Sequence, residues 1–420
     1  MHETPVVTVF LRNGGEILLL RRSDEVGSYR GRWGTVAGHA EGDPDAAVRE
    51  EIREETGIDP DGRTTLQRRG EPFEVVDAEL ETRWIVHPYL FESDTRTVEP
   101  NEETTEFEWV APTAILRRET VPDLWTSYDR VRPGVETIRS DTDHGAAFLS
   151  VRALEVLRDE AAVATITHAV GDWAALVDTA RHLVDARPSM PVLSNRIDRA
   201  MAEAATDGTV AAVERAASDG IDRALAADEA AASAAAEAIC TDRIATLSRS
   251  GTVRRTLERV DPAAVLVAES RPGGEGAIVA SELADALPAT VTLTTDAAFP
   301  ARCDEWGAGA LVVGADAIFA DGCVRNKVGT RAAATLARTE AIDVYVVAAV
   351  DKITPELSLP DEPRPKGELT ADDRVAVENP TFETTPASAI DAVVTEKGVL
   401  TDDSLADVVA QVRERRAWRT

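Results

Sequence analysis

Three carboxylates on one predicted helix have the residue type and the spacing of a cation site. Glu51, Glu54 and Glu55 are three and four residues apart, so in a helix they share one face. Stacked like charges destabilise a helix by about 0.2–0.5 kcal/mol per pair, and a hard divalent cation would turn this repulsion into binding. The alternative is a charged helix face that only contacts solvent.

A second cluster combines glycines with an arginine. Residues 269–276 read Glu-Ser-Arg-Pro-Gly-Gly-Glu-Gly and lead into a helical pattern. Glycines at a strand-to-helix turn present backbone N–H groups to an anion, and Arg271 adds a forked donor for phosphate. The turn contains three glycines and one acidic residue: Gly273, Gly274, Gly276 and Glu275.

A third cluster follows the apolar run at 310–315. Asp316 comes directly after this run, and Asn326 and Lys327 follow about ten residues later. They supply an acid, an amide and one of only four lysines in the chain. In open parallel sheets, ligands bind beyond the carboxyl ends of the strands, where these side chains are expected.

The elements that position the first cluster are those of a mixed α and β domain. Asp43 is a favourable N-cap, Pro44 suits the first helical position, and Gly57 can end the helix in a left-handed conformation. A helix is therefore predicted over residues 43–56. Short strands are predicted at 6–10, 16–20, 73–77, 84–91 and 106–110, the first two joined by an Asn-Gly-Gly hairpin turn.

The second half of the chain has a different pattern. From about residue 145 it is rich in alanine, and its apolar residues recur at spacings of three and four residues, which predicts helices. Beyond residue 262, apolar runs typical of buried parallel strands alternate with helical patterns. We expect a first domain at 1–138 and a second at 139–420. The second is expected to contain a helical cap at 143–258 and a Rossmann-like, doubly wound parallel sheet at 259–420.

The acidic helix resembles the Nudix box, Gly-x5-Glu-x7-Arg-Glu-U-x-Glu-Glu-x-Gly-U, where U is aliphatic. Residues 53–58, Arg-Glu-Glu-Thr-Gly-Ile, match its end, and Gly38 matches its start. The resemblance covers about residues 4–130. It implies an α/β/α sandwich and Mg²⁺- or Mn²⁺-assisted attack of water on a diphosphate linked to another group. The metal ligands it implies are Glu41, Glu51, Glu54 and Glu55, the last three also being catalytic.

One position departs from the box. Counting back from Glu54 puts Glu50 where the family has arginine, and Arg49 lies one residue early. Either a local bulge in the helix restores Arg49, or the usual arginine–glutamate support is altered. Both Glu50 and Glu51 therefore stay candidates for the third ligand. A Nudix fold that binds its ligand without hydrolysing it is the alternative.

Two further acidic residues lie near the expected end of the first domain. Glu106 and Glu108 precede Trp109 in a predicted strand. Either could serve as a base or an extra ligand, and the alternative is surface charge.

The other two clusters resemble a second family. It is shared by translation initiation factor 2B α/β/δ subunits, ribose-1,5-bisphosphate isomerase and methylthioribose-1-phosphate isomerase, and the resemblance runs from about 145 to 415. Segments 350–353, 379–386 and 394–398 also match. The resemblance implies a crevice for a phosphorylated sugar or a nucleotide. The residues it implies there are Ser248, Arg271, Gly273, Gly274, Glu275, Gly276, Asp316, Asn326 and Lys327.

One catalytic residue of these isomerases is absent. They use a cysteine and an aspartate; Asp316 matches the aspartate, whereas Ser248 stands where the cysteine would fall. A serine hydroxyl is a poor proton shuttle without an activating base. The departure favours a ligand-sensing relative over an isomerase. Asn195 and Arg196 of the helical part are further candidates to face the crevice, and the alternative is a surface role.

Composition limits the partners and the environment. Lys+Arg 45 against Asp+Glu 75 gives a net charge of −30, which disfavours general binding to nucleic acid. An acidic, lysine-poor surface is typical of a high-salt, haloarchaeal cytoplasm. Three scattered cysteines indicate a reducing compartment, and neither a signal peptide nor a membrane span is evident. A cytoplasmic protein is expected.

Three functions follow from these observations. The first is a Mg²⁺-dependent Nudix hydrolase of a nucleoside-diphosphate-linked compound, fused to a domain that binds a sugar phosphate or nucleotide. The second is a regulatory relative of initiation factor 2B with a metabolite-sensing Nudix domain and translation initiation factor 2 as partner. The third is an isomerase of the ribose-1,5-bisphosphate type. The resemblance also implies a homodimer or a higher homo-oligomer.

Overall fold

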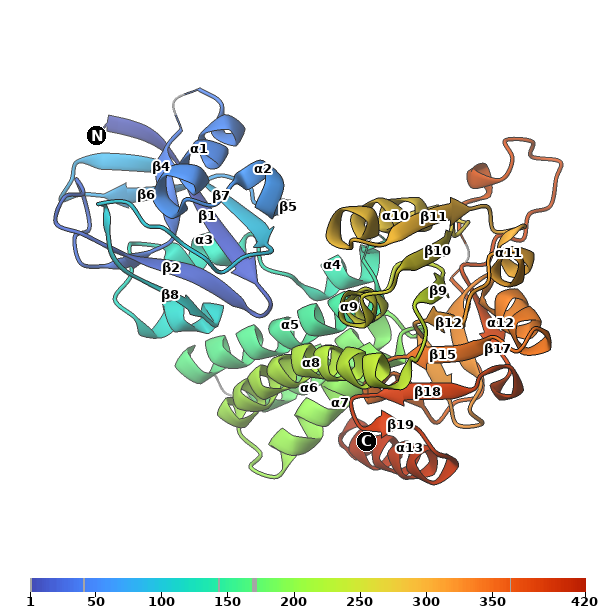
Figure 1. Ribbon diagram of the computed structural model, residues 1–420. Helices are drawn as coiled ribbons and strands as arrows, with labels where there is room; N and C mark the ends of the chain where they lie inside the picture. Colours follow the sequence, from blue (N-terminus) through green and yellow to red (C-terminus); the bar gives the residue numbers. More distant parts are fainter. Residues whose placement is uncertain (1, 41, 143, 168–171, 363) are drawn as a thin grey trace. The chain divides into compact units, whose positions relative to one another are not determined.

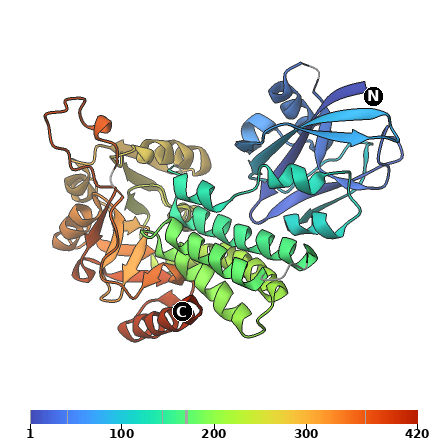
Figure 2. The ribbon, with the colours of Figure 1, turned by 180° about the vertical axis from the view of Figure 1, so that it is seen from behind.

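The protein has a mixed α/β fold, as predicted, and divides into two compact units (Figures 1 and 2). The computed structural model describes residues 2–40, 42–142, 144–167, 172–362 and 364–420. Unit 1 comprises Met1–Thr137, Glu155–Leu176 and Gly208–Ser218. Unit 2 comprises Ile138–Leu154, Val177–Asp207 and Asp219–Thr420.

Unit 1 is built on an 8-stranded mixed sheet. Its strands are β1 (His2–Asn13), β2 (Glu16–Arg22), β3 (Trp33–Gly34), β4 (Val36–His39), β5 (Thr64–Arg69), β6 (Phe73–Asp77), β7 (Thr82–Ser93) and β8 (Thr104–Val110). The main order is β3-β2-β1-β7-β5, while β4 pairs with β1, β6 with β7 and β8 with β2. Only β1 and β7 run parallel among these pairs.

Helices cover both faces of this sheet, as the predicted sandwich requires. The helix α1 (Pro44–Thr56) follows the N-cap Asp43 and ends at Gly57, which has a φ of 69°. The helix α3 (Leu124–Asp129) covers the opposite face, and the helix α2 (Pro60–Arg63) and a 3-10 helix at Pro112–Arg117 connect the strands. Odd-numbered residues of β1 pack with α1 and Phe10 packs with α3, because successive side chains of a strand point to opposite faces.

The described residues in the middle of the chain form five helices: α4 (Val135–Ser140), α5 (Ala146–Thr167), α6 (Asp172–Ala186), α7 (Pro191–Ala205) and α8 (Val210–Ala238). Their alanine content suits close packing, and α5, α6 and α8 contribute residues to both units. None of the helices in the described parts of the chain is long and apolar enough to cross a lipid bilayer.

Unit 2 contains a 7-stranded sheet in the order β11-β10-β9-β12-β15-β18-β19. The strands are β9 (Arg243–Thr246), β10 (Ala264–Ala268), β11 (Thr290–Thr294), β12 (Ala310–Val313), β15 (Asp343–Val347), β18 (Ala392–Thr395) and β19 (Gly398–Val399). All pairs are parallel except β18 with β19. The chain order reverses between β9 and β12, which makes this point the topological switch of a doubly wound sheet.

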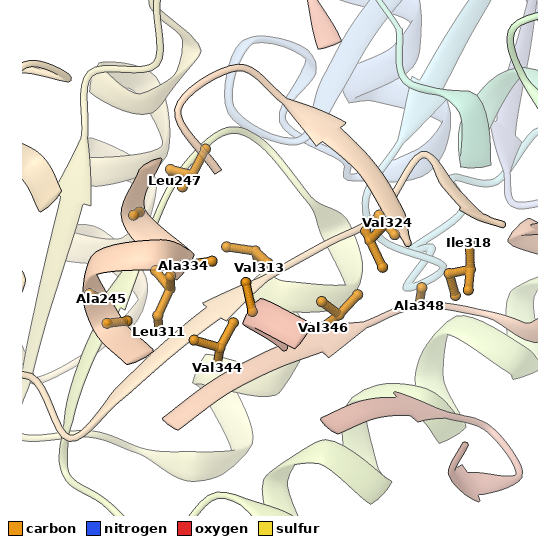
Figure 3. Close-up of a cluster of buried hydrophobic side chains, with 14 of the residues drawn as sticks. Ala245, Leu247, Leu311, Val313, Ile318, Val324, Ala334, Val344, Val346 and Ala348 are labelled. Carbon is orange, nitrogen blue, oxygen red and sulfur yellow. The ribbon is translucent and has the colours of Figure 1, made fainter. Parts of the chain in front are cut away.

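Helices enclose both faces of the large sheet. The helices are α9 (Gly251–Val260), α10 (Glu275–Ala286), α11 (Phe299–Glu305), α12 (Thr330–Thr339) and α13 (Asp402–Arg415). Leu311 and Val313 of β12 pack with α11, α12 and α13, while Ala310 and Val312 pack with α8, α9 and α10. Figure 3 shows Leu311 and Val313 in the first of these clusters. Burial on both faces explains the continuous apolar runs in the sequence.

A 4-stranded sheet and short 3-10 helices complete unit 2. The sheet has the order β16-β13-β14-β17. Its strands are β13 (Ala317–Phe319), β14 (Val324–Lys327), β16 (Ile353–Thr354) and β17 (Phe382–Thr385). The 3-10 helices are Val350–Lys352, Lys366–Glu368, Ala387–Ala389 and Arg416–Arg419. This sheet holds Asn326 and Lys327 in β14.

The large sheet begins earlier than the sequence pattern suggests. The strand β9 at Arg243–Thr246 lies within residues 143–258, which were expected to be helical, and it is a central strand. Its apolar run is only two residues, Ile244 and Ala245, and it follows a long alanine-rich stretch. So short a run gives no strand signal of its own.

Candidate functional site

Two of the three helix carboxylates, Glu51 and Glu55, lie against the edge strand β4. A Cβ on Gly38 would lie 1.7 Å from Oε1 of Glu51, so only glycine leaves room for that carboxylate against the strand. The backbone N–H of Ala37 donates to Oε1 of Glu55 over 3.2 Å. Glu55 is only 6% exposed, whereas Glu51 is half-buried and Glu54 is exposed.

Burial and mutual repulsion disfavour the ionised forms of these side chains. Burial raises the pKa of Glu51 to about 7, with further contributions from Glu54, Glu103 and Glu50. Burial raises the pKa of Glu55 to about 8, although the N–H of Ala37 opposes the shift. A site that holds carboxylates together at this cost is suited to a cation.

Glu103 is a further carboxylate of this group that the sequence analysis missed. It raises the pKa values of both Glu51 and Glu55, so its charge lies close to both. Its backbone is fixed, because its N–H donates to Oδ1 of Asn101 over 3.0 Å and its carbonyl accepts from Ser23 over 2.7 Å. Its position one residue before β8 is the only signal that the sequence offered.

The two acidic residues proposed from the sequence in this region have other partners. Glu106 forms an ion pair with Arg21 at 3.2 Å, and Glu108 pairs with Arg118. Both side chains are therefore engaged in ion pairs with arginines.

The departure from the Nudix box has a structural explanation. The helix α1 runs without a break from Pro44 to Thr56, so no bulge moves Arg49 into the position of the family arginine. Nε of Arg49 instead bonds to Oδ1 of Asp61 over 3.0 Å. Glu50 is exposed. The usual arginine–glutamate support is therefore altered.

The donor set suits a hard divalent cation, although the side chains are not gathered as a complete ligand shell. Glu41 lies outside the described residues. Among the residues that the structure describes, no three His, Cys, Asp or Glu side chains are close enough together to hold a metal ion. Glu51, Glu54, Glu55 and Glu103 nonetheless offer only oxygen donors, which Mg²⁺ and Mn²⁺ prefer.

In unit 2, the switch point of the sheet brings three predicted residues together. Ser248 follows β9 with a φ of 65°, and its hydroxyl donates to Oε1 of Glu275 over 3.0 Å. Nζ of Lys327 lies 2.7 Å from the same oxygen and also donates to the carbonyl of Pro272. One carboxylate oxygen thus joins the loops that follow β9 and β10 to β14.

The glycine turn is shaped by close backbone contacts. A Cβ on Gly276 would lie 1.8 Å from the carbonyl oxygen of Ala268, so glycine lets α10 begin against β10. The N–H of Gly276 donates to the carbonyl of Glu269 over 3.1 Å. The N–H of Gly274 likewise donates to a carbonyl within the turn, over 3.0 Å. These two donors serve the turn itself, while Gly273 adopts a φ of 97°.

Arg271 lies at the open side of this turn. Its side chain is 72% exposed, and its Nε is 3.6 Å from Oε2 of Glu269. Its backbone N–H donates to Asp296, which also accepts from Ser270 over 2.8 Å. Asp296 therefore fixes the backbone while the guanidinium group is left accessible.

Asp316 lies on the other side of the switch point, three residues after the end of β12 and directly before β13. It is half-buried, and burial raises the pKa of its carboxyl, opposed by the charges of Lys352, Arg325 and Lys327. Nζ of Lys352 donates to the carbonyl of Ala315, the residue before Asp316. The structure thus places an acid and several cations at one edge of the sheet.

Two other predicted residues support this edge from within. The buried Asn326 donates through Nδ2 to Oγ1 of Thr330 over 3.1 Å. The buried Asn195 donates to the carbonyls of Asp351 and Ile353, each over 2.7 Å. Both amides therefore hold loops at the carboxyl edge.

An unpredicted buried ion cluster continues this support. Nε of Arg196 lies 3.2 Å from Oδ2 of Asp351, and Arg199 pairs with the other carboxylate oxygen. Burial would raise the pKa of Asp351, but the two guanidinium groups outweigh it and hold this pKa below its usual value. Arg196 is thus engaged in fixing the segment that carries Lys352.

Family models match both parts of the chain. Residues 2–131 match the NUDIX domain. Residues 142–402 match the Initiation factor 2 subunit family, which is more than half of the chain.

Several known proteins are similar in sequence to the second part. Ribose 1,5-bisphosphate isomerase of Haloferax volcanii is 29% identical over 307 residues, which is 68% of this chain and 94% of that protein. Methylthioribose-1-phosphate isomerase of Methylococcus capsulatus is 36% identical over 177 residues, 39% of this chain and 49% of that protein. The chain therefore spans about half the length of the latter.

Solved structures show the same fold. The translation initiation factor eIF-2B of Pyrococcus horikoshii has a TM-score of 0.54 at 26% identity, covering 63% of this chain and 94% of that chain. The 5-methylthioribose 1-phosphate isomerase of Pyrococcus horikoshii has a TM-score of 0.53 at 21% identity, covering 74% of this chain and 89% of that chain. The second similarity shows the fold alone.

Proposed function

Since this chain belongs to the Initiation factor 2 subunit family and carries an N-terminal NUDIX domain, we propose that it joins two activities. The NUDIX domain hydrolyses a diphosphate linked to another group, with a nucleoside diphosphate as the favoured core. The second domain binds a phosphorylated sugar or a nucleotide at the switch point of its sheet.

The placement of carboxylates along β4 carries the first part of this proposal. Glu51 and Glu55 lie against Gly38 and Ala37, and the charge of Glu103 lies close to both. Together with Glu54 they would hold Mg²⁺ or Mn²⁺. When bound, the cation would neutralise charge on the diphosphate and lower the pKa of a coordinated water.

The side chains of the protein supply the proton transfer. Glu51 would serve either as the third ligand or as the base that accepts the proton of the attacking water. As the new P–O bond forms, the bridging P–O bond breaks and its electron pair leaves with the departing phosphate. The N–H of Ala37 keeps Glu55 oriented during this step.

A substrate screen tests the hydrolase. The full chain is incubated in molar KCl with Mg²⁺ and a panel of nucleoside diphosphate derivatives, and the products are separated by chromatography. We expect cleavage of at least one compound, with a loss of about 10²-fold or more in Glu54→Gln and Glu55→Gln. Full activity in both variants would contradict the assignment of the metal ligands.

The polar side chains at the switch point support the second part of the proposal, the binding of a phosphorylated sugar or a nucleotide. Ser248, Glu275, Lys327 and Asp316 come from four separate segments and meet at the carboxyl edge. Lys327 and the exposed guanidinium group of Arg271 would bind phosphate, and Asp316 would accept a hydrogen bond from a ribose hydroxyl. Calorimetry with ribose 1,5-bisphosphate and with nucleoside monophosphates tests this binding.

A second candidate function for this domain is isomerisation of a phosphorylated ribose. The match to ribose 1,5-bisphosphate isomerase over 94% of that protein favours it. The hydroxyl of Ser248 bonds to Glu275, yet it lacks the acidity of a thiol, so the proposal remains binding without turnover. Conversion of ribose 1,5-bisphosphate to ribulose 1,5-bisphosphate, abolished by Asp316→Asn, would establish the isomerase instead.

The proposed assembly and location follow from the same family. A tetrameric eIF2B complex of Chaetomium thermophilum shares the fold, with a TM-score of 0.51 at 20% identity. We infer a homodimer or a higher homo-oligomer, with translation initiation factor 2 as a partner under the regulatory alternative. The three cysteines are free thiols, in keeping with a cytoplasmic location. Light scattering that gives a 45 kDa monomer in high salt would contradict the oligomer.

A further inference from the structure

A long segment of unit 2 runs from β16 to β17 with little packing of its own. It covers residues 355–381, and the only helical turn among its described residues is the 3-10 helix Lys366–Glu368. Three of its large apolar side chains are exposed: Leu357, Leu369 and Val375. Loops of more than about 12–15 residues in a compact domain are usually functional or disordered. We name the described part of this segment, residues 355–362 and 364–381, the strap.

One carboxylate of the strap, that of Glu362, is bound at both oxygens. Nη2 of Arg187 donates to Oε2 over 3.0 Å, and the hydroxyl of Ser189 donates to Oε1. Ser189 is 5% exposed, and the side chain of Arg187 is 12% exposed. Nη1 of Arg187 donates to the carbonyl of Asp141, which fixes the guanidinium group in its position. Two donors that lie largely out of solvent therefore depend on Glu362 for an acceptor.

The backbone of the strap next to Glu362 is also held in place. The buried Arg325 of β14 donates through Nη2 to the carbonyl of Pro360 over 2.8 Å. The carbonyl of Glu362 accepts from Oγ1 of Thr381 over 2.7 Å. These bonds are polar and few, so the strap is the kind of segment that opens locally while the rest of the domain stays folded.

The strap reaches the crevice at two places. Burial is the main cause that raises the pKa of Asp316, and the charge of Glu362 adds to it, so the two carboxylates lie close together. A Cβ on Gly273 would lie 3.7 Å from Nζ of Lys327 and 3.9 Å from Cζ of Arg364. The strap thus approaches both the acid and the glycine turn of the crevice.

A carboxylate and a phosphate group use the same kinds of donor. The fork of an arginine and a neighbouring hydroxyl can bind two oxygens of either anion. Arg187 and Ser189 cannot serve two anions at once, and a phosphate beside Glu362 would be repelled by its charge. A phosphorylated ligand in the crevice therefore competes with Glu362.

We propose that the strap is an autoinhibitory element of the crevice, in which Glu362 occupies Arg187 and Ser189 until a phosphorylated ligand displaces it. The inference rests on the proposed function, because it takes the crevice to bind a phosphorylated sugar or a nucleotide. It adds a regulation of that site, since only molecules with a released strap are competent to bind. A strap that is docked in about nine molecules of ten lowers the apparent affinity about tenfold.

Calorimetry with ribose 1,5-bisphosphate on the full chain in molar KCl tests the competition. Glu362→Gln keeps the shape of the side chain but removes its charge, and it is expected to bind the ligand about tenfold more tightly than wild type. Glu378→Gln is the matched control, because Glu378 is an exposed acidic residue of the same strap. It is expected to bind with the affinity of wild type. Circular dichroism melts verify that each variant is folded.

Hydrogen–deuterium exchange of the strap amides gives a second readout that does not depend on affinity. Saturating ribose 1,5-bisphosphate is expected to raise the exchange of residues 356–362 in wild type, because the ligand releases the strap. Glu362→Gln is expected to show this faster exchange without ligand. Slower exchange on binding would identify a lid that closes over the ligand and would overturn the inference.

The outcomes distinguish this inference from the proposed function. Equal or weaker binding by Glu362→Gln would overturn the autoinhibition and leave the binding site standing. An equal gain in Glu378→Gln would assign the effect to overall charge and would also overturn it. Binding by Glu362→Gln where wild type shows none would support the inference. Failure of both to bind would overturn the inference and the proposed binding function together.

Discussion

Replacing Glu55 with glutamine removes a buried carboxylate but keeps an oxygen that can accept the N–H of Ala37. Burial raises the pKa of Glu55 to about 8, compared with a reference value of 4.5. Between these two pH values the folded state binds more protons than the unfolded state. The stability contributed by the protonated side chain is therefore complete below pH 4.5 and is lost as the pH rises through 8.

The size of this effect follows from the shift. The difference between about 8 and 4.5 is roughly 3.5 pH units, and each unit corresponds to about 1.36 kcal/mol. The upper limit is thus ~5 kcal/mol, and relaxation around the charge makes about 2–5 kcal/mol the expected range. Without metal, Glu55→Gln should match wild type near pH 4.5 and be more stable at pH 8.5 by this amount.

Thermal and urea melts in molar KCl with a chelator measure the difference at both pH values. Glu50→Gln is the matched control, because Glu50 is exposed on the same helix. It should change the free energy of unfolding by less than about 0.5 kcal/mol. Adding Mg²⁺ at pH 8.5 should stabilise wild type and the control, but stabilise Glu55→Gln much less.

Two results would refute this reasoning. If Glu55→Gln is less stable than wild type at pH 8.5 without metal, the carboxylate is not held at an electrostatic cost. If Mg²⁺ stabilises Glu55→Gln as much as wild type, Glu55 does not contribute to the cation site.

Three further predictions concern other parts of the chain. Gly38→Ala should lower hydrolysis at least tenfold with only a small change in melting temperature, because the new methyl group displaces the flexible end of Glu51; unchanged activity would contradict the contact. Arg271→Ala should weaken binding of ribose 1,5-bisphosphate about tenfold in calorimetry, and an unchanged affinity would remove Arg271 from the phosphate site. Because the net charge is −30, the melting temperature should rise steeply from low salt to molar KCl as screening relieves repulsion, so a flat series would argue against adaptation to high salt.

Local signals in the sequence were sufficient for the carboxylate helix. Asp43, Pro44 and Gly57 define the ends of α1 through capping, which depends only on neighbouring residues. Glu103 could not be found in this way. It approaches Glu51 and Glu55 only because the sheet brings the start of β8 next to the end of β2, a contact between residues distant in sequence.

The second domain likewise combines features that local sequence signals predict with contacts between residues distant in sequence. Continuous apolar runs indicate a parallel sheet, but strand order decides which loops meet at its edge. The segments that carry Ser248 and Asp316 follow neighbouring strands because the chain order reverses between β9 and β12, and the short β9 gave no signal of its own. Likewise, the bond of Ser248 to Glu275 depends on a left-handed serine that no spacing rule predicts.

Hydrolysis by Glu51→Gln and Glu50→Gln in parallel tests the central claim most directly. The two residues are adjacent on α1, but Glu51 lies against Gly38 of β4 whereas Glu50 is exposed. Phosphorus NMR with Mg²⁺ and the best nucleoside diphosphate derivative follows the reaction. The account predicts that Glu51→Gln loses activity by 10²-fold or more. It also predicts that Glu50→Gln keeps wild-type activity. Wild-type rates in Glu51→Gln, or no metal-dependent cleavage by the unmodified chain, would contradict it.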